Sequence, residues 1–165
     1  MNRRTILSLT TMTMLCLAVV FATALPQPGL AQSNPWLGMW KLNLAKSTYA
    51  PGQTPRSTTF NFQGAGANLT NTVDTVDAAG NSIRTVAMHN YDGQPHPVTG
   101  SPDVDARSYT RVDANTVISA SMKAGKLVQV ATLVLSQDGR TITVTTRGTD
   151  ARGQQVNTVS VNDKQ

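Results

Sequence analysis

The chain has 165 residues and a formal net charge of +5, and its nine acidic residues are all aspartate. The length is that of one domain, and the basic residues form neither a run nor a basic helix, so nucleic-acid binding is not supported. Glutamate favours helices, whereas aspartate favours turns. The acids fall mostly at predicted turns: Asp92, Asp113, Asp138 and Asp150.

Residues 1–31 are predicted to be a signal peptide. Arg3 and Arg4 form a basic start, an apolar stretch follows, and small residues before Gln32 offer a cleavage site. The arginine pair also resembles a twin-arginine signal, so the general and twin-arginine export routes both stay open. The apolar stretch is long enough for an uncleaved anchor, which is the less favoured alternative. Residues 32–165 would form one domain, periplasmic or secreted, with no membrane span after cleavage.

Cys16, the single cysteine, lies inside this signal, after Leu15. A lipoprotein signal needs a small residue where Leu15 stands, so no lipid anchor is expected. The mature chain would have no cysteine, which excludes disulfides, thiolate metal sites and a cysteine nucleophile. The exported domain therefore has to rely on its own core.

Beyond the signal, the chain is predicted to form about nine strands in series. The first is expected from Trp36, and residues 43–49 favour one or two turns of helix. The other predicted strands cover residues 58–63, 68–76, 82–91, 104–112, 116–123, 127–136, 141–149 and 155–162. Short separators such as Asp138-Gly139 favour antiparallel pairing of neighbours. The predicted fold is all-β, an antiparallel up-and-down barrel or half-barrel that hides its edges.

Residues 60–91 look like a first copy of residues 133–164. Asp77-Ala78-x-Gly80 in the first copy matches Asp150-Ala151-x-Gly153 in the second. Each copy is predicted to be a three-stranded meander in which Gly80 and Gly153 are structural turn residues. Coincidence in a chain rich in Thr and Val is the alternative.

Alternation predicts which side chains share a face of a strand. In residues 104–112 the predicted inner set is Val104, Ala106, Ser108, Thr110 and Val112, and the predicted outer set is Asp105, Arg107, Tyr109 and Arg111. Residues 127–135 are apolar on both faces, so a cover is expected outside them, from the helical turn near Ala45 or from a partner. The inner side chains are mostly small, which predicts either a bound ligand or a flattened barrel with a dry core.

No enzyme is predicted, because no catalytic set is evident. The chain has no Gly-x-Ser-x-Gly elbow and no phosphate-binding glycine loop before a helix. Asp103 and Asp105 are the nearest pair of carboxylates, and a solvated pair beside Arg107 is the favoured interpretation. A metal site needs three or four converging ligands, and His89 and His96 do not predict one. No cofactor is expected.

The segment 91–102 is the most unusual part of the sequence. Three prolines and two glycines in twelve residues predict a rigid, shaped loop, and both histidines flank or enter it. His89, Tyr91 and His96 are the predicted ligand contacts, as the polar rim of a pocket mouth. Tyr109 is a further candidate contact that could stack on a neighbouring arginine, although a solvated sheet edge is the favoured alternative.

Gly38-Met39-Trp40 resembles the lipocalin signature Gly-x-Trp. The resemblance implies that Gly38 and Trp40 are structural, that Trp40 closes the base of a barrel, and that an arginine packs against it, Arg147 and Arg152 being the candidates. A resemblance over nearly the whole mature chain is to small exported bacterial proteins of lipocalin-like type. It is carried by residues 34–43, 91–102 and 163–165, and it implies a fold and a location but no activity.

These observations predict a non-enzymatic envelope or secreted protein that binds a small, partly apolar or amphipathic molecule inside or at the mouth of its barrel. The alternative is a structural or interaction protein with a filled core and no ligand. The sequence leaves open the identity of the ligand, the closure of the barrel and the oligomeric state.

Overall fold

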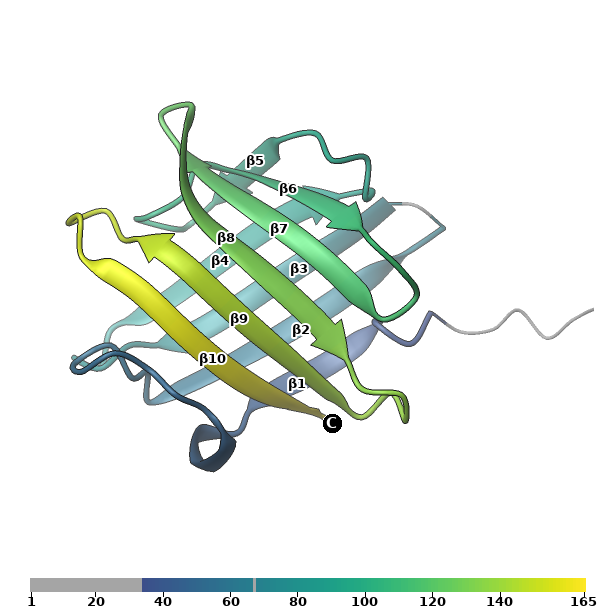
Figure 1. The fold of residues 1–165 in the computed structure, drawn as a ribbon, viewed down its shortest axis with the longest axis horizontal. Coiled ribbons are helices and arrows are strands. Elements are labelled where there is room, and N and C mark those ends of the chain that lie inside the picture. Colours follow the sequence, from purple (N-terminus) through teal and green to yellow (C-terminus); the bar gives the residue numbers. More distant parts are fainter. Residues whose placement is uncertain (1–33, 67) are drawn as a thin grey trace, which may run out of the picture. The chain divides into compact units, whose positions relative to one another are not determined.

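The computed structural model describes residues 34–66 and 68–165, so the predicted signal peptide lies outside the described residues. The described residues form a closed antiparallel barrel in which the strands follow one another in up-and-down order (Figure 1). The elements are β1 (Gly38–Leu42), the 3-10 turn η1 (Leu44–Lys46), β2 (Ser57–Ala65), β3 (Asn68–Val76), β4 (Ser82–His89), β5 (His96–Thr99), β6 (Ala106–Arg111), β7 (Thr116–Lys123), β8 (Lys126–Leu135), β9 (Thr141–Thr149) and β10 (Gln155–Lys164).

The barrel closes through its first strand, which pairs on both sides. Trp40 of β1 lies opposite Phe60 of β2 and opposite Lys164 of β10. Each of the described strands therefore has two neighbours, and none of them presents a free edge that a second chain could extend. The predicted all-β, up-and-down architecture is confirmed, and the barrel rather than the half-barrel is the form observed.

The strand that the sequence did not predict is β5, which raises the count from about nine to ten. It lies inside the segment expected to be a loop, and it pairs through only two residues on each side: Ala87 with Val98 and Val86 with Thr99 on β4, and His96 with Arg107 and Pro97 with Ala106 on β6. A strand this short shows almost no alternation, and proline removes a backbone donor. Closure of the barrel, a long-range requirement, decides its conformation.

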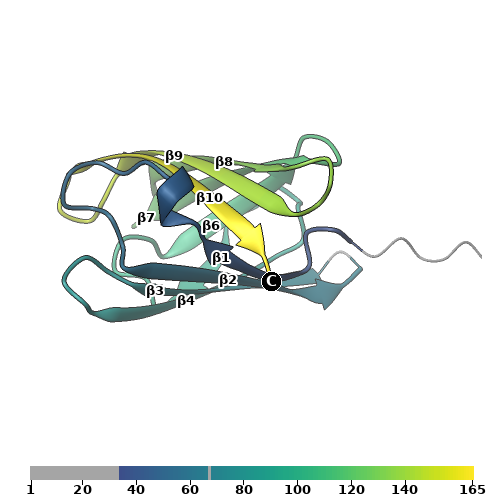
Figure 2. The same ribbon diagram turned by 90° about the horizontal axis from the view of Figure 1, so that it is seen from below.

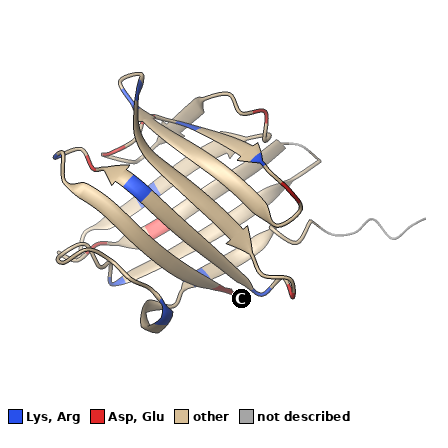
Figure 3. Ribbon diagram, viewed as in Figure 1, with Lys and Arg blue, Asp and Glu red and all other residues tan. Residues whose placement is uncertain are grey.

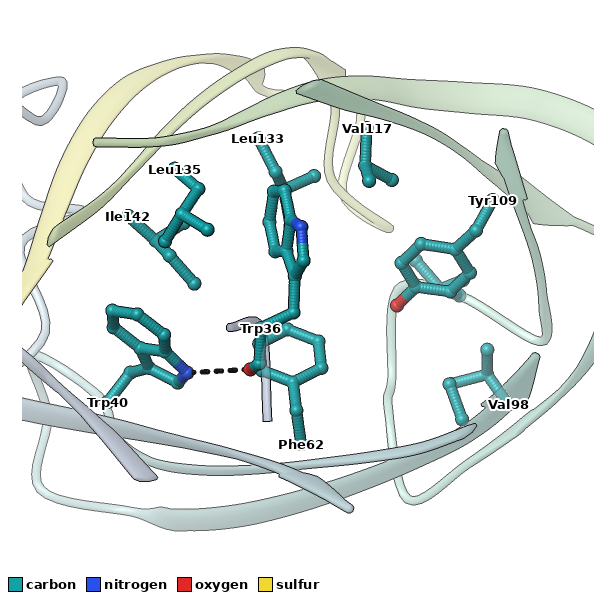
Figure 4. Packing of buried hydrophobic residues seen from close by; sticks show 11 residues of the cluster. Trp36, Trp40, Phe62, Val98, Tyr109, Val117, Leu133, Leu135 and Ile142 are labelled. Atoms are coloured by element: carbon teal, nitrogen blue, oxygen red, sulfur yellow. Dashed lines mark hydrogen bonds between the residues drawn. The ribbon is translucent and has the colours of Figure 1, made fainter. Parts of the chain in front are cut away.

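The barrel is flattened, with β1–β4 in one wall and β8–β10 in the other (Figure 2). Buried side chains from both walls fill the space between them, and the largest fully buried ones are Trp36 and Trp40. Figure 4 shows Trp36 between Phe62 of one wall and Leu133 of the other. Of the two interiors that the sequence allowed, the flattened barrel with a packed core is the one observed.

Trp40 is fully buried in this core, and the cation beside its ring is not the arginine that the resemblance implied. Its indole Nε1–H donates to the Trp36 carbonyl at 3.1 Å, and Lys164 Nζ lies 4.9 Å from the centre of the ring. The two expected partners, Arg147 and Arg152, are both exposed. The expectation of an arginine is therefore wrong, because the register of β1 with β10 places Lys164 opposite Trp40.

The face assignment within β6 is wrong for most of its residues, although Val104, just before the strand, and Ser108, both expected inside, are buried. Tyr109 is only 2% exposed and lies opposite the buried Ser119, whereas Val112, expected inside, is 57% exposed. Arg107 and Arg111 share the inner face with Tyr109, opposite Ser121 and Val117 of β7. Alternation identifies side chains on a common face but not which face is inside. In β6 the inner face carries Arg107, Tyr109 and Arg111, of which Tyr109 is buried, Arg107 is half-buried and Arg111 is exposed.

The two predicted repeats form matching meanders, β2–β4 and β8–β10. The backbone N–H of Gly80 donates to Asp77 O at 3.1 Å, and that of Gly153 donates to Asp150 O at 3.0 Å. Both glycines have positive φ, 99° and 75°, a backbone conformation that favours glycine. The β2–β3 turn is shorter than the β8–β9 turn, because Ala65 pairs with Asn68 whereas Leu135 pairs with Ile142.

The outer face of β8 is not covered by the helical turn near Ala45, and the other expected cover, a partner, stays a prediction. Val130 and Val134 are 39% and 43% exposed. The turn η1 lies beside β10 instead, where the Asn43 N–H donates to Val161 O at 2.8 Å. Charged residues are spread over strands and turns without a single dominant patch (Figure 3). No helix in residues 34–66 and 68–165 is long and apolar enough to cross a bilayer.

Candidate functional site

The candidate site lies beside β5, where the barrel wall has the fewest paired residues. Strand β4 ends at His89, the chain turns at Tyr91, β5 begins at His96, and β6 carries Tyr109. The four residues predicted as ligand contacts therefore come from neighbouring strands and the turn between them. The structure brings three of them into an aromatic cluster and places His96 on the rim beside it.

His89 is the centre of the aromatic cluster. Its ring stacks on Tyr109, with the centroids 3.9 Å apart, and meets the Tyr91 ring edge-on at 4.9 Å. The Arg111 guanidinium lies 4.4 Å from the centre of the Tyr91 ring. Tyr91 has a φ of 61°, a left-handed conformation that bulky residues rarely adopt. Strain of this kind concentrates at functional sites, so the turn at Tyr91 is a functional candidate in its own right.

Hydrogen bonds connect Tyr109 to the polar inner face. Its phenol oxygen accepts from Asn71 Nδ2 at 3.3 Å and from Arg107 Nη1 at 3.4 Å, and Arg107 Nε donates to Ser121 Oγ at 2.9 Å. Both ring nitrogens of His89 and Asn71 Oδ1 are buried and have no hydrogen-bond partner among the described residues. Buried polar atoms without partners are uncommon in folded proteins, and these three lie in one cluster.

A depression of about 260 Å³ opens to solvent next to the cluster. It is smaller than the roughly 300–1,000 Å³ of typical ligand pockets. Leu69 and Met88 give it apolar surface, and His89 and His96 give it polar surface. Its lining residues are Asn68, Leu69, Thr70, Met88, His89, Asn90 and His96.

His96 is held in place by the loop itself. Its Nε2 lies 3.0 Å from Asp92 Oδ1, and the same carboxylate oxygen accepts the Gln94 N–H at 2.8 Å. The backbone hydrogen bond from Gln94, and then the contact with His96, lower the pKa of Asp92. The pairing of His96 with Asp92 therefore shapes the rim of the depression.

Burial lowers the pKa of His89 from its usual 6.5 to about 4, and His96, Arg107 and Arg111 add to the shift in that order. The imidazole is therefore neutral at pH 7, with one N–H donor and one acceptor nitrogen. Burial also raises the pKa of Tyr91, which keeps its phenol protonated. The cluster is thus a set of neutral aromatic groups beside two arginines.

The lowered pKa of His89 predicts that the free energy of unfolding falls as the pH is lowered. Well above pH 6.5, His89 is neutral in both the folded and the unfolded chain. Between pH 6.5 and about 4, His89 is protonated in the unfolded chain but stays neutral in the folded chain. Relative to His89→Phe, the protein is expected to lose about 2 kcal/mol of unfolding free energy between pH 7.5 and 5. Urea unfolding at several pH values measures this difference, and parallel curves for the two proteins would contradict it.

The sequence missed the polar partners of the cluster. Arg107 and Arg111 were assigned to the outer face, and Asn71 was not singled out. The signal for Asn71 was its place in β3, where alternation puts it on the same face as Leu69, which is also buried. The alternation of Arg107, Tyr109 and Arg111 was visible, but its inward direction was not.

Except for His96 and Asp92, the aspartates and histidines of the described residues lie apart from one another or contact turns. Residues 34–66 and 68–165 contain no group of three or more His, Cys, Asp or Glu side chains placed to hold a metal ion. Asp103 Oδ1 accepts the Ala151 N–H and Asp105 Oδ2 accepts the Ala124 N–H, each at 2.8 Å. Each carboxylate therefore accepts a hydrogen bond from the backbone of a turn. The ion pair with Arg107 that the sequence favoured is not among the ion pairs of the described residues.

Comparison with known proteins adds no identification. No protein-family model matches the chain, and no curated protein matches it with significance. The described residues establish a closed antiparallel barrel of ten strands.

Proposed function

We propose that this protein is a non-enzymatic, exported, lipocalin-like protein that binds a small, partly apolar molecule at the mouth of its barrel. The observation that carries the proposal is the buried His89 ring, which borders the depression and has no hydrogen-bond partner at either nitrogen among the described residues. The basic, apolar start of the sequence supports a periplasmic or secreted location.

The cost of unpartnered polar atoms supports this interpretation. Each buried polar atom without a partner costs roughly 1–3 kcal/mol, and His89 and Asn71 contribute three such atoms. A bound molecule with a donor and an acceptor would offset part of that cost, while Leu69 and Met88 would contact its apolar part. Because Trp36 and its neighbours fill the interior, the proposal is for binding at the mouth rather than inside the barrel.

Native mass spectrometry of protein purified from its own host tests the proposal, because a retained small molecule adds a discrete mass. A fluorescence titration with the neutral dye N-phenyl-1-naphthylamine gives the affinity. His89→Leu and Tyr91→Ala are each expected to weaken the dye about tenfold or more, the loss expected from one well-placed contact. Thr132→Ala, on the outer face of β8, is the matched control and is expected to change nothing.

A dye that fails to saturate on the folded protein, together with an unliganded mass from the host, would contradict ligand binding. Equal dye affinity in all three variants would keep the binding but overturn the assignment of the site to His89 and Tyr91.

The packed interior favours a second candidate, a structural or interaction protein of the cell envelope that takes no ligand. In that case the protein from its own host would carry a second polypeptide or a second copy in the native mass spectrum. A copurified small molecule supports the first candidate, and a copurified chain supports the second.

A further inference from the structure

We infer that the ligand is an anion, a small amphipathic molecule whose carboxylate or comparable oxyanion is bound by Arg107 and Arg111. The inference rests on the proposed function and deepens it by naming the chemical class. Its basis is the inner face of β6, where two cations lie beside buried groups that lack hydrogen-bond partners.

The two arginines have no acidic partner among the described residues. The ion pairs found there are Lys46–Asp163, Arg84–Asp74, His96–Asp92 and Arg152–Asp150. Arg107 is partly buried and contacts only neutral oxygens, those of Ser121 and Tyr109. A partly buried cation without a counter-charge is unfavourable, and an oxyanion would supply both the charge and strong, charge-assisted hydrogen bonds.

Nearby carboxylates are engaged elsewhere. Asp92 pairs with His96, and Asp105 accepts the backbone N–H of Ala124. The turns around the mouth therefore leave the positive charge of β6 unneutralised. The lowered pKa of His89 is consistent with this positive charge, because Arg107 and Arg111 both act to lower it.

The hydrogen-bonding groups of the cluster are mostly donors. Arg107 and Arg111 carry only donors, and neutral His89 has one N–H. The Tyr109 oxygen accepts two hydrogen bonds, while its own hydrogen has no acceptor among the described contacts. Asn71 Oδ1 is the exception, an acceptor that a hydroxyl or N–H of the ligand would fill. An oxyanion, with several lone pairs, matches this set better than a neutral polar group does.

The surroundings also indicate the rest of the ligand. The depression is about 260 Å³ and carries Leu69 and Met88 beside His89. Met88 is 65% exposed, so the apolar surface continues outward along β4. The arginines do not line this depression themselves: Arg107 contacts Tyr109 and Arg111 lies over Tyr91, and both tyrosines pack on His89, which does line it. The ligand class that follows is a short aliphatic or aromatic acid, with its head group beside the His89 cluster and its apolar part toward Met88.

A matched pair of probes, octanoate and octan-1-ol, isolates the charge. Both are titrated by two-dimensional NMR at neutral pH and low salt into the mature protein. Octanoate is expected to bind at least tenfold more tightly, and added salt is expected to weaken octanoate alone. Arg107→Gln and Arg111→Gln should each reduce octanoate affinity to that of the alcohol and leave the alcohol unchanged. Arg147→Gln, on the exposed outer face of β9, is the control and should alter neither.

The outcomes separate this inference from the proposed function. Equal affinity for acid and alcohol, or an acid preference that survives both β6 substitutions, overturns the anionic class and leaves ligand binding intact. Absence of binding by either probe and by the neutral dye contradicts the proposed function itself. If Arg107→Gln fails to fold, Arg111→Gln still decides the question, because Arg111 is exposed and its loss removes little packing.

Discussion

Trp36→Ala is expected to lower the free energy of unfolding by about 3–5 kcal/mol, the range for deleting a buried large aromatic side chain. The Trp36 side chain is 1% exposed and lies between the two walls of the barrel (Figure 4). Its Nε1–H also donates to Ala114 O at 3.1 Å, which ties the start of the barrel to the β6–β7 turn. Urea unfolding followed by circular dichroism measures the loss.

Trp36→Phe is the matched control, because it keeps most of the ring volume and removes the indole donor. It is expected to cost clearly less than Trp36→Ala. A second readout is a dry cavity, since apolar cavities of this kind bind small apolar molecules. Trp36→Ala should therefore gain an interior site for benzene that the unmodified protein lacks. An unchanged stability would mean that Trp36 does not hold the walls together.

Gly148→Ala is expected to have the next largest effect. Gly148 has a φ of 143° and lies opposite Gln129, and an added Cβ would overlap the Val128 carbonyl oxygen and come within 2.7 Å of Gln129 Cα. Backbone atoms of a paired strand cannot move aside as a flexible side chain can. Overpacking of this kind costs about 1–3 kcal/mol, in addition to about 1–3 kcal/mol for the unfavourable backbone conformation.

Gly153→Ala separates these two contributions. Gly153 has a φ of 75°, but an added Cβ would meet nothing within 4 Å. It should therefore lose only the conformational part, about 1–2 kcal/mol, as measured by thermal unfolding. Equal losses for the two variants would show that the approach of β8 to β9 at Gly148 is not close enough to exclude a side chain.

The sequence predicted the individual hairpins well because their signals are local. Strands β3, β7 and β9 have the predicted limits, and each is bounded by short turns. In the turn at Asp138 the carboxylate accepts the Arg140 N–H, and in the turn at Asp150 it accepts the Gln154 N–H. Aspartates and glycines of this kind determine a turn through contacts within a few residues, so no distant part of the chain is needed to interpret them.

The site was predicted less completely. His89, Tyr91 and His96 were found through their unusual segment, and Tyr109 through its arginine neighbours. The stack of His89 on Tyr109 depends on β5 joining β4 to β6, and that short strand was not visible in the sequence. Arg107 and Asn71 are the hydrogen-bond partners of Tyr109. They belong to the candidate site because β6 and β3 face each other across the barrel, which the sequence does not reveal.

The amino-acid sequence by itself determined the all-β class, most strand limits, the turn glycines and the segment that carries the candidate site, because alternation and turn chemistry act over a few residues. The tertiary structure alone decided the closure through β1 and β10, the added strand β5, the filling of the interior by Trp36, and the inward direction of the arginines of β6. These features depend on pairings between residues far apart in the chain, where the register of whole strands determines which face becomes the interior.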